Sequence, residues 1–322
     1  MQAISISRRA FLKRAGVSCA CGLLVGGRGS AATLPAPNRI GYSTIAWPEN
    51  QFGHALATIS RLGFTGVQLV GWARERYASR VKALRDRLQA RHLTPVAQSC
   101  WGVMLDPGNP GDNAATVRAY AEFFKSLGGS ILQVTDSGKP GGPYSAENIR
   151  QLGERMNDLG RIALDHGLEL GYHPHVGSFG ETEEGVARIL GATDAKLVKL
   201  IADTGHLALG GMDPVNIIRK YRDRLILIHL KDVRKDAYAA TRASRAALRD
   251  LKYLFCEIGS GALDLASIRK ALRETDYRGW LIVELDGNEP APGGPDEGAR
   301  ANRDGLKKLG WEMKSMKMKC EG

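Results

Sequence analysis

The chain has 322 residues, of which 43% are hydrophobic and 25% are charged, a composition typical of a globular protein with a sizeable core. The formal net charge is +11, but basic and acidic residues are mostly interspersed, which does not favour a nucleic-acid-binding surface. No uncharged apolar run reaches the roughly 18 residues that a transmembrane helix needs, so we expect no stable membrane span. The five cysteines lack the spacing of a disulfide framework or a CxxC metal site.

Residues 1–32 have the features of a twin-arginine export signal. Arg8 and Arg9 are followed by Phe11 and Leu12, then by a short, glycine-containing apolar stretch and small residues suited to cleavage before Thr33. This leader holds five basic residues and no acid, so residues 33–322 carry a formal charge of +6. We expect the twin-arginine export machinery as a partner and a periplasmic or otherwise extracytoplasmic location. The alternative is a disordered basic leader without a targeting role.

From residue 39 onward, short apolar runs rich in β-branched residues alternate with longer amphipathic stretches. The alternation predicts eight strands, at Ile40–Ile45, Gly66–Val70, Thr94–Ser99, Ile131–Thr135, Leu168–His173, Leu197–Asp203, Leu225–Leu230 and Trp280–Leu285. Helical patterns between them include Val81–His92, Ala114–Leu127, Ala146–His166, Pro214–Tyr221 and Leu265–Glu274. Capping residues precede two of these helices, at Ser145 and Asp213, and glycines follow others.

Strand, helix and strand at this spacing imply parallel pairing, and eight such units can close into a (β/α)8 TIM barrel. An open doubly wound sheet is the competing architecture, but no GxGxxG turn follows the first strand, which continues as GYSTIAWPEN. We therefore expect one α/β barrel domain at residues 33–322, with a short basic tail at its C-terminal end. A TIM barrel places its chemistry at the C-terminal ends of its strands.

Polar residues gather at the predicted ends of strands five to eight. The segments there are YHPHVGS, ADTGHLALGG, IHLKDV and LIVELDGN, which contribute His173, His175, Asp203, His206, His229, Lys231, Asp232, Glu284 and Asp286. Imidazoles and carboxylates that converge on a barrel axis suit a divalent metal ion. Singly, each residue also has an ordinary structural explanation. A histidine can be hydrogen-bonded in the core, Asp203 can cap a loop, and Glu284 can pair with Lys231.

Two aromatic residues and one loop carry weaker signals. Trp47 and Trp101 follow strands one and three, where an aromatic side chain either stacks on a sugar ring or packs in the core. The turn-rich loop at 138–144 either covers the barrel mouth or only connects two elements. We count Trp47, Trp101, Gln68 and Asp232 as candidate substrate-binding residues.

The motifs YHPHVGS, DTGHLALGGMDP, IHLKDV, IGSGALDL and YRGWLIVELD, in this order, resemble the xylose-isomerase-like barrel superfamily of sugar isomerases and epimerases. Within it, the chain is most similar to inosose dehydratases, over most of its length after the leader. The resemblance implies one divalent metal ion (Mn, Co, Zn or Mg) held at four strand-end positions, which are His173, Asp203, His229 and Glu284 here. Many relatives carry glutamate where this chain has His173, which makes epimerisation by two glutamates less favoured.

The resemblance implies chemistry through an enediolate of a keto-polyol or keto-sugar. The metal would stabilise the enediolate, Glu284 or His175 would remove the α-proton, and His206 or Lys231 would protonate the departing hydroxyl. Dehydration is the leading expectation, and isomerisation or epimerisation through the same intermediate is the alternative. A non-catalytic sugar-binding barrel and a metal-dependent nuclease remain open, although Gln68 and the lack of a further His-x-His segment argue against apurinic endonucleases. The sequence leaves open whether the chain forms a homo-oligomer.

Overall fold

A computed structural model describes residues 39–106, 113–137, 145–243, 251, 253–286 and 293–313. The predicted leader at residues 1–32, the loop at 138–144 and the basic tail beyond residue 313 lie outside the described residues. The export signal therefore stays a prediction. None of the described helices has the length and apolar character needed to cross a membrane.

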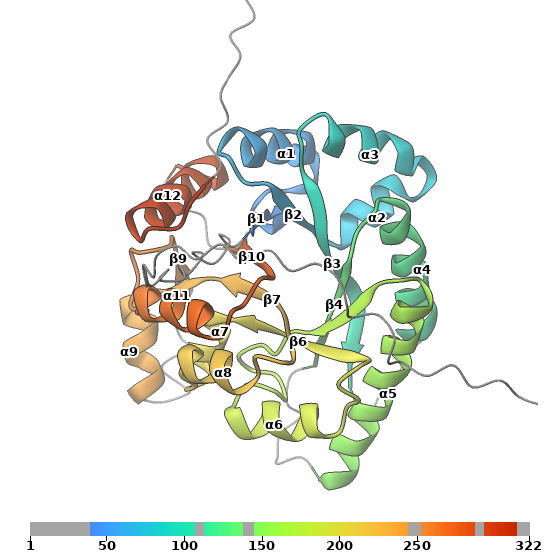
Figure 1. Cartoon of the computed structure of the whole chain (residues 1–322), viewed down its shortest axis with the longest axis vertical. Coiled ribbons are helices and arrows are strands. Elements are labelled where there is room, and N and C mark those ends of the chain that lie inside the picture. Colours follow the sequence, from blue (N-terminus) through green and yellow to red (C-terminus); the bar gives the residue numbers. More distant parts are fainter. Residues whose placement is uncertain are drawn as a thin grey trace, which may run out of the picture. The chain divides into compact units, whose positions relative to one another are not determined.

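Eight parallel strands close into a barrel in the order β1-β10-β7-β6-β5-β4-β3-β2, with helices around the outside (Figure 1). The predicted TIM barrel is confirmed, because each predicted strand is present and pairs with the neighbour that a closed parallel barrel requires. The barrel strands are β1 (Arg39–Ser43), β2 (Gly66–Leu69), β3 (Thr94–Leu105), β4 (Ile131–Asp136), β5 (Glu169–Tyr172), β6 (Val198–Asp203), β7 (Leu225–Leu230) and β10 (Trp280–Val283).

The main departure from the predicted strands is β3, which runs six residues beyond the expected end at Ser99. Its pairing with β4 is interrupted after Ser99 and resumes in a shifted register, with Met104 opposite Thr135 and Leu105 opposite Asp136. An interruption of this kind bends a strand and redirects its side chains. Trp101 lies in the interrupted stretch with 46% of its surface exposed.

Helices cover the outside of the barrel, and α12, near the end of the chain, lies beside α1 (Figure 1). The predicted caps are present: the side chain of Ser145 accepts from the backbone N–H of Asn148, and that of Asp213 accepts from the N–H of Val215. The described α-helices are α1 (Phe52–Arg61), α2 (Gly71–Tyr77), α3 (Val81–Gln89), α4 (Asn113–Ser126), α5 (Ala146–Asp165), α6 (Glu183–Gly191), α7 (Thr204–Leu209), α8 (Pro214–Lys220), α9 (Lys235–Ala243), α11 (Leu265–Glu274) and α12 (Pro295–Lys308). Short 3-10 turns lie at Thr44–Ala46, Glu49–Gln51 and Ala78–Arg80.

The strands bury apolar side chains on both faces, as parallel barrel strands must. A large cluster fills the layer between strands and helices, and a smaller one includes Val96, Ile131, Ile201, Leu227 and Ile282. After β7 the chain adds a two-stranded antiparallel sheet, β8 (Asp232–Val233) with β9 (Phe255–Cys256). This small sheet brings the ring of Phe255 against His206, with ring centroids 4.9 Å apart.

Candidate metal centre

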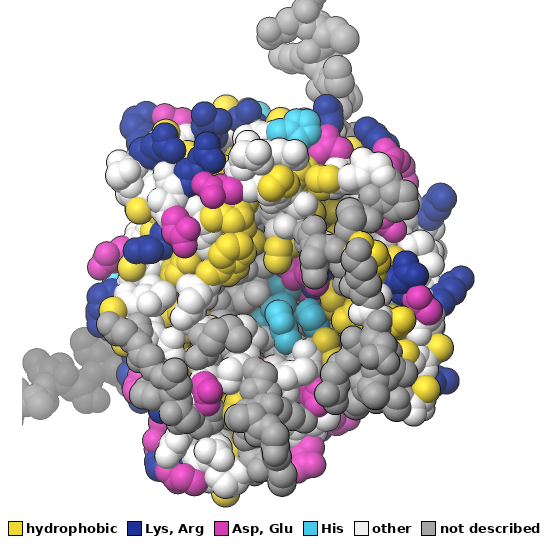
Figure 2. Space-filling model, turned by 180° about the vertical axis from the view of Figure 1, so that it is seen from behind, with side chains coloured by type: hydrophobic (Ala, Val, Ile, Leu, Met, Phe, Trp, Pro, Cys, Tyr) yellow, Lys and Arg dark blue, Asp and Glu magenta, His cyan; other side chains and the backbone are white. Residues whose placement is uncertain are grey.

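Four adjacent strands carry the predicted ligands to the same end of the barrel. His173 directly follows β5, Asp203 ends β6, His229 lies in β7 and Glu284 directly follows β10. All four side chains are buried. Figure 2 shows histidine side chains, with carboxylates beside them, at the bottom of a hollow in the face it presents.

Three polar atoms in this group have no hydrogen-bond partner although each is buried: Nε2 of His173, Oδ2 of Asp203 and Nδ1 of His229. Burial of a polar group without a partner is costly, so an unpaired atom requires an explanation. Each ligand atom of this trio lies within 4.8 Å of the other two. Oδ2 of Asp203 also lies 3.3 Å from the ammonium of Lys231, but three converging atoms that lack a hydrogen bond still fit a bound cation better than they fit a packed core.

The spacing of the ligand atoms of His173, Asp203 and His229 matches part of a metal coordination shell, and Glu284 lies beside this trio, next to His229. Oδ2 of Asp203 lies 3.5 Å from Nε2 of His173 and 3.5 Å from Nδ1 of His229, and that Nδ1 lies 3.6 Å from Oε1 of Glu284. Four ligands at about 2.1 Å from a tetrahedral ion are separated by about 3.4 Å. Nitrogen and carboxylate oxygen at this separation suit Zn²⁺ and related divalent ions, so the residues present fit the predicted metal.

The charges of the site also leave room for a dication. The Lys231 ammonium lies 3.3 Å from Asp203, 3.1 Å from Glu284 and 3.2 Å from Asp286. Three carboxylates and one ammonium have a formal charge of −2 if the imidazoles are neutral. The ordinary explanation for Glu284, an ion pair with Lys231, is thus present, but that pair leaves two negative charges without a counter-ion.

The protonation states suit this role. Burial raises the pKa of Glu284, but the neighbouring His229 and Lys231 outweigh burial and lower it to about 2. Burial likewise opposes ionisation of Asp203, and Lys231 is the strongest of the groups that hold its pKa well below its usual range. Burial lowers the pKa of His173, which favours the neutral imidazole. Ionised carboxylates and neutral imidazoles are the forms that bind metal ions.

Asp203 has a second structural role. While Oδ2 faces the other ligands, Oδ1 accepts hydrogen bonds from the backbone N–H groups of Gly205 and His206 and so caps α7. A Cβ atom at Gly205 would lie 2.9 Å from Cγ of Lys231 and from the ring of Phe255, so only glycine allows this close approach. The DTGH segment therefore fixes the direction of Asp203 and the place of His206 together.

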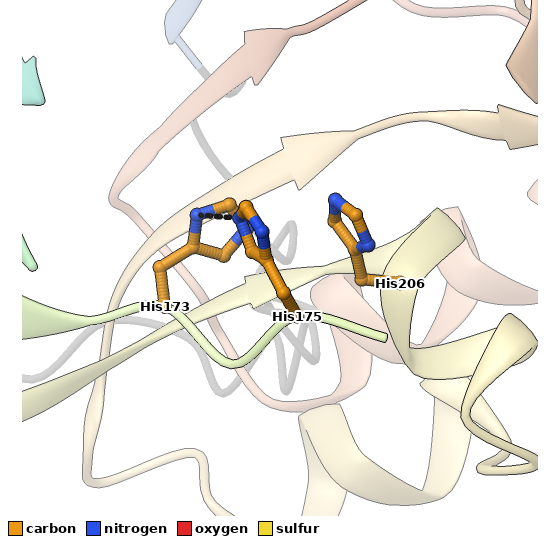
Figure 3. Close-up of side chains that lie close together, drawn as sticks. All are labelled: His173, His175 and His206. Carbon is orange, nitrogen blue, oxygen red and sulfur yellow. Dashed lines mark hydrogen bonds between the residues drawn. The ribbon is translucent and has the colours of Figure 1, made fainter. Parts of the chain in front are cut away.

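His175 and His206 form a stacked pair beside the ligands. Their rings lie 4.2 Å apart and nearly parallel, at 10°, and Nε2 of His175 lies 3.2 Å from Nδ1 of His173 (Figure 3). Burial lowers the pKa of both His175 and His206 well below the usual value, and neighbouring imidazoles and Lys231 add to this effect. The lowered pKa keeps the imidazole of His175 neutral, and its partial exposure leaves it accessible.

The comparisons with known proteins agree with this geometry. The family model described as xylose isomerase-like TIM barrel matches residues 56–309. The chain belongs to this family. A curated inosose dehydratase of Clostridium botulinum (strain Alaska E43 / Type E3) is 29% identical over 292 residues, covering 84% of this chain and 96% of the relative.

Two solved structures have a similar fold. An IolI protein with a bound zinc atom superposes with a TM-score of 0.69 at 15% identity, covering 86% of this chain and all of that one. The 3-keto-D-glucoside 4-epimerase YcjR from E. coli superposes with a TM-score of 0.63 at 18% identity, covering 84% of this chain and 98% of that one. At these identities the two likenesses establish the shared barrel.

Two residues that we expected to bind substrate in this xylose isomerase-like barrel have other roles. Trp47 is 1% exposed, packs edge-on against Tyr42, and donates from Nε1 to Asp296 at the start of α12. The carboxylate of Asp232 is also buried and accepts hydrogen bonds from the backbone N–H groups of four residues, namely Val233, Gly259, Gly261 and Leu263. Both side chains are structural here, because their polar atoms are already used within the fold.

The other two candidates differ from each other. Trp101 is exposed and remains available to a ligand. Gln68 is fully buried, and its amide hydrogen-bonds to His229 and Glu284 instead of facing open space. The sequence reasoning missed Gln133, whose amide nitrogen lies 2.9 Å from Nδ1 of His173. Gln133 lies within the apolar run ILQVTD, and a polar residue in such a run indicates a side chain that faces the barrel interior.

Proposed function

We propose that this chain is a divalent-metal-dependent enzyme that removes a proton next to the ketone of a polyol or sugar and releases the neighbouring hydroxyl as water. The observation that carries the proposal is the convergence of three buried atoms that make no hydrogen bond, close to Glu284 and to the stacked pair of His175 and His206. The similarity to inosose dehydratases over 84% of the chain supports a keto-polyol substrate and a lyase reaction.

His173, Asp203, His229 and Glu284 would hold the ion, which when bound supplies a Lewis acid that stabilises negative charge on the substrate's carbonyl oxygen. His175 takes the α-proton, because it is the partly exposed imidazole of the site. Glu284 is less suited to this task, since its oxygens already accept from Gln68 and Lys231.

The remaining proton goes to the departing hydroxyl. His175 accepts one proton from the substrate, and the hydroxyl needs one proton to leave as water. His175 and its stacked neighbour His206 can therefore carry out both proton transfers. Burial opposes the charge on Lys231, but Asp203, Asp286 and Glu284 hold the pKa of its ammonium well above the usual range. Lys231 therefore stabilises developing negative charge by electrostatic attraction and does not donate a proton.

Dehydration is favoured over epimerisation by the same geometry. Epimerisation by direct proton transfer needs a base or acid on each face of the substrate. His175 and His206 lie ring against ring and therefore act from the same side. Dehydration in which the proton and the hydroxyl leave from the same face of the substrate needs acid and base groups on that face only.

The test uses protein stripped of metal with a chelator and then reloaded with Mn²⁺, Co²⁺, Zn²⁺ or Mg²⁺. Each form is incubated in D₂O with keto-inositols and with 3-keto-glycosides, and water loss and deuterium uptake are followed by NMR. Metal-dependent water loss would support the proposal. Deuterium uptake without water loss would assign an isomerase or epimerase, and metal binding with neither reaction would leave a sugar-binding barrel. Cleavage of abasic duplex DNA would assign a nuclease.

We also propose that the protein is exported by the twin-arginine machinery and works outside the cytoplasm. The support is the Arg8–Arg9 pair in its leader context. Cell fractionation of the full chain and of the Arg8→Lys/Arg9→Lys double variant tests this. We expect the double variant to stay in the cytoplasm, and equal export of both proteins would contradict the proposal.

A further inference from the structure

Gln68 lies at a junction beneath the four ligands. Its side chain is fully buried in β2, and its amide contacts four side chains that come from other parts of the barrel wall. Nε2 lies 3.2 Å from Oγ of Ser99, 3.2 Å from Oε1 of Gln133 and 3.0 Å from Oε2 of Glu284. Oε1 lies 2.8 Å from Nε2 of His229. One amide thus joins two of the ligands.

The partners of Gln68 fix which way its amide faces. An ionised carboxylate only accepts hydrogen bonds, so the atom of Gln68 that faces Glu284 must be the nitrogen. The reversed amide would set its oxygen against Oε2 of Glu284. Gln68 therefore presents its carbonyl oxygen to His229.

This orientation determines where His229 carries its proton. A carbonyl oxygen only accepts, so Nε2 of His229 must donate, and of the two uncharged tautomers only the Nε2–H form can do so. The lone pair is then on Nδ1, which is the buried atom that has no hydrogen-bond partner and lies 3.5 Å from Asp203 and 3.6 Å from Glu284. The same amide engages Oε2 of Glu284 and so leaves Oε1 facing Nδ1 of His229.

We propose that Gln68 is a positioning residue that fixes the Nε2–H tautomer of His229 and the orientation of Glu284, so that one lone pair from each faces a shared cation. The metal-binding half of this inference rests on the proposed function, whereas the tautomer is a property of the chain itself. Groups that orient metal ligands from behind typically change metal affinity by 10- to 100-fold.

Two variants and a matched control separate this role from packing. Gln68→Met keeps the length of the side chain but removes both hydrogen-bonding atoms. Gln68→Glu keeps an acceptor opposite His229. Gln98→Met is the control, because Gln98 is also fully buried and lies on the neighbouring strand β3, but its amide nitrogen donates to the backbone oxygen of Ser99 and not to a proposed ligand.

The first measurement is the tautomer of His229 in the metal-free protein, read from ¹⁵N NMR of histidine-labelled samples assigned with His229→Gln. We expect the proton on Nε2 in the wild type, in Gln68→Glu and in Gln98→Met, and a shifted or mixed tautomer in Gln68→Met. An unchanged tautomer in Gln68→Met, or a lost one in Gln68→Glu, would overturn the inference.

The second measurement is affinity for Zn²⁺ and Co²⁺ by competition with a chelator, on samples whose circular dichroism confirms folding. We expect Gln68→Met to bind 10- to 100-fold more weakly than Gln98→Met, and equal affinities would refute the positioning role. If the wild type binds neither ion, the proposed function fails, while the tautomer result still decides the role of Gln68 towards His229. If Gln68→Met does not fold, a lost tautomer in Gln68→Glu still refutes the role and a retained one supports it.

Discussion

Replacement of Asp203 with Asn removes one of the two proposed anionic ligands and keeps the size of the side chain. Asparagine keeps an oxygen that can accept from the backbone N–H groups of Gly205 and His206, so the cap of α7 survives. The atom that replaces Oδ2 carries no charge and lies among His173, His229 and Lys231. We expect Asp203→Asn to fold as the wild type does but to bind a dication at least about 100-fold more weakly, since loss of a ligand exceeds loss of a supporting group.

The difference is measurable as a metal-induced shift in thermal stability. At a free metal concentration 100 times the wild-type Kd, binding stabilises the wild type by about 2.7 kcal/mol. A variant with a 100-fold higher Kd gains only about 0.4 kcal/mol at that concentration. For a domain of this size, 1 kcal/mol moves Tm by about 2–4 °C. We therefore expect a rise of roughly 5–10 °C for the wild type and about 1 °C for Asp203→Asn by differential scanning calorimetry.

The matched control is Asp213→Asn, because Asp213 also caps a helix, α8, through the N–H of Val215, but it is exposed and is not one of the ligands. This control should show the full metal-induced rise in Tm. The proposal that Asp203 is a ligand would be refuted if metal raised the Tm of Asp203→Asn as much as that of the wild type and elemental analysis found the same metal content in both.

Three further predictions concern residues around the ligands. His175→Ala should keep the metal and lose about 10²- to 10⁴-fold in kcat, and loss of metal content would instead make His175 a ligand. Asp232→Ala should lower the free energy of unfolding by at least about 3 kcal/mol in urea titrations, because four backbone N–H groups lose their acceptor, while a metal-binding role would predict lost metal and unchanged stability. Burial raises the pKa of Asp136 to about 6, so between about pH 4 and 6 the folded protein holds a proton that the unfolded chain has released, and stability falls as pH rises through this window. Asp136→Asn should remove this trend and gain roughly 3 kcal/mol on the wild type between pH 4 and pH 7, and parallel stability curves would contradict it.

The barrel and the place of its site were predictable because both depend on local patterns. Alternating strands and helices indicate a parallel barrel, and the barrel places strand ends together, so His173, Asp203 and His229 meet as expected and Glu284 lies next to His229. The alternation of side chains along a strand also predicts the direction of Asp232. His229 and Lys231 both point inward, so Asp232, the next residue after Lys231, had to point away.

Other features depend on contacts that no local pattern encodes. Buried Trp47 donates its indole N–H to Asp296, which lies 249 residues later in the chain. The residues around strand one therefore give no sign of this partner. The role of Gln68 depends on Glu284 and His229, on strands two and three places away around the barrel. The extension of β3 to Leu105 results from a shifted register with β4, and register is set by the partner strand.

The shared use of Asp203 has a consequence for how substrate preference can change. One oxygen of this carboxylate caps α7 and the other faces His173 and His229, so the backbone of His206, a proposed catalytic residue, is tied to the orientation of a proposed ligand. A substitution in this segment would therefore disturb both residues at once. If the proposed function holds, a change of substrate preference is expected at exposed segments such as the interrupted part of β3 around Trp101, which lies apart from this shared carboxylate.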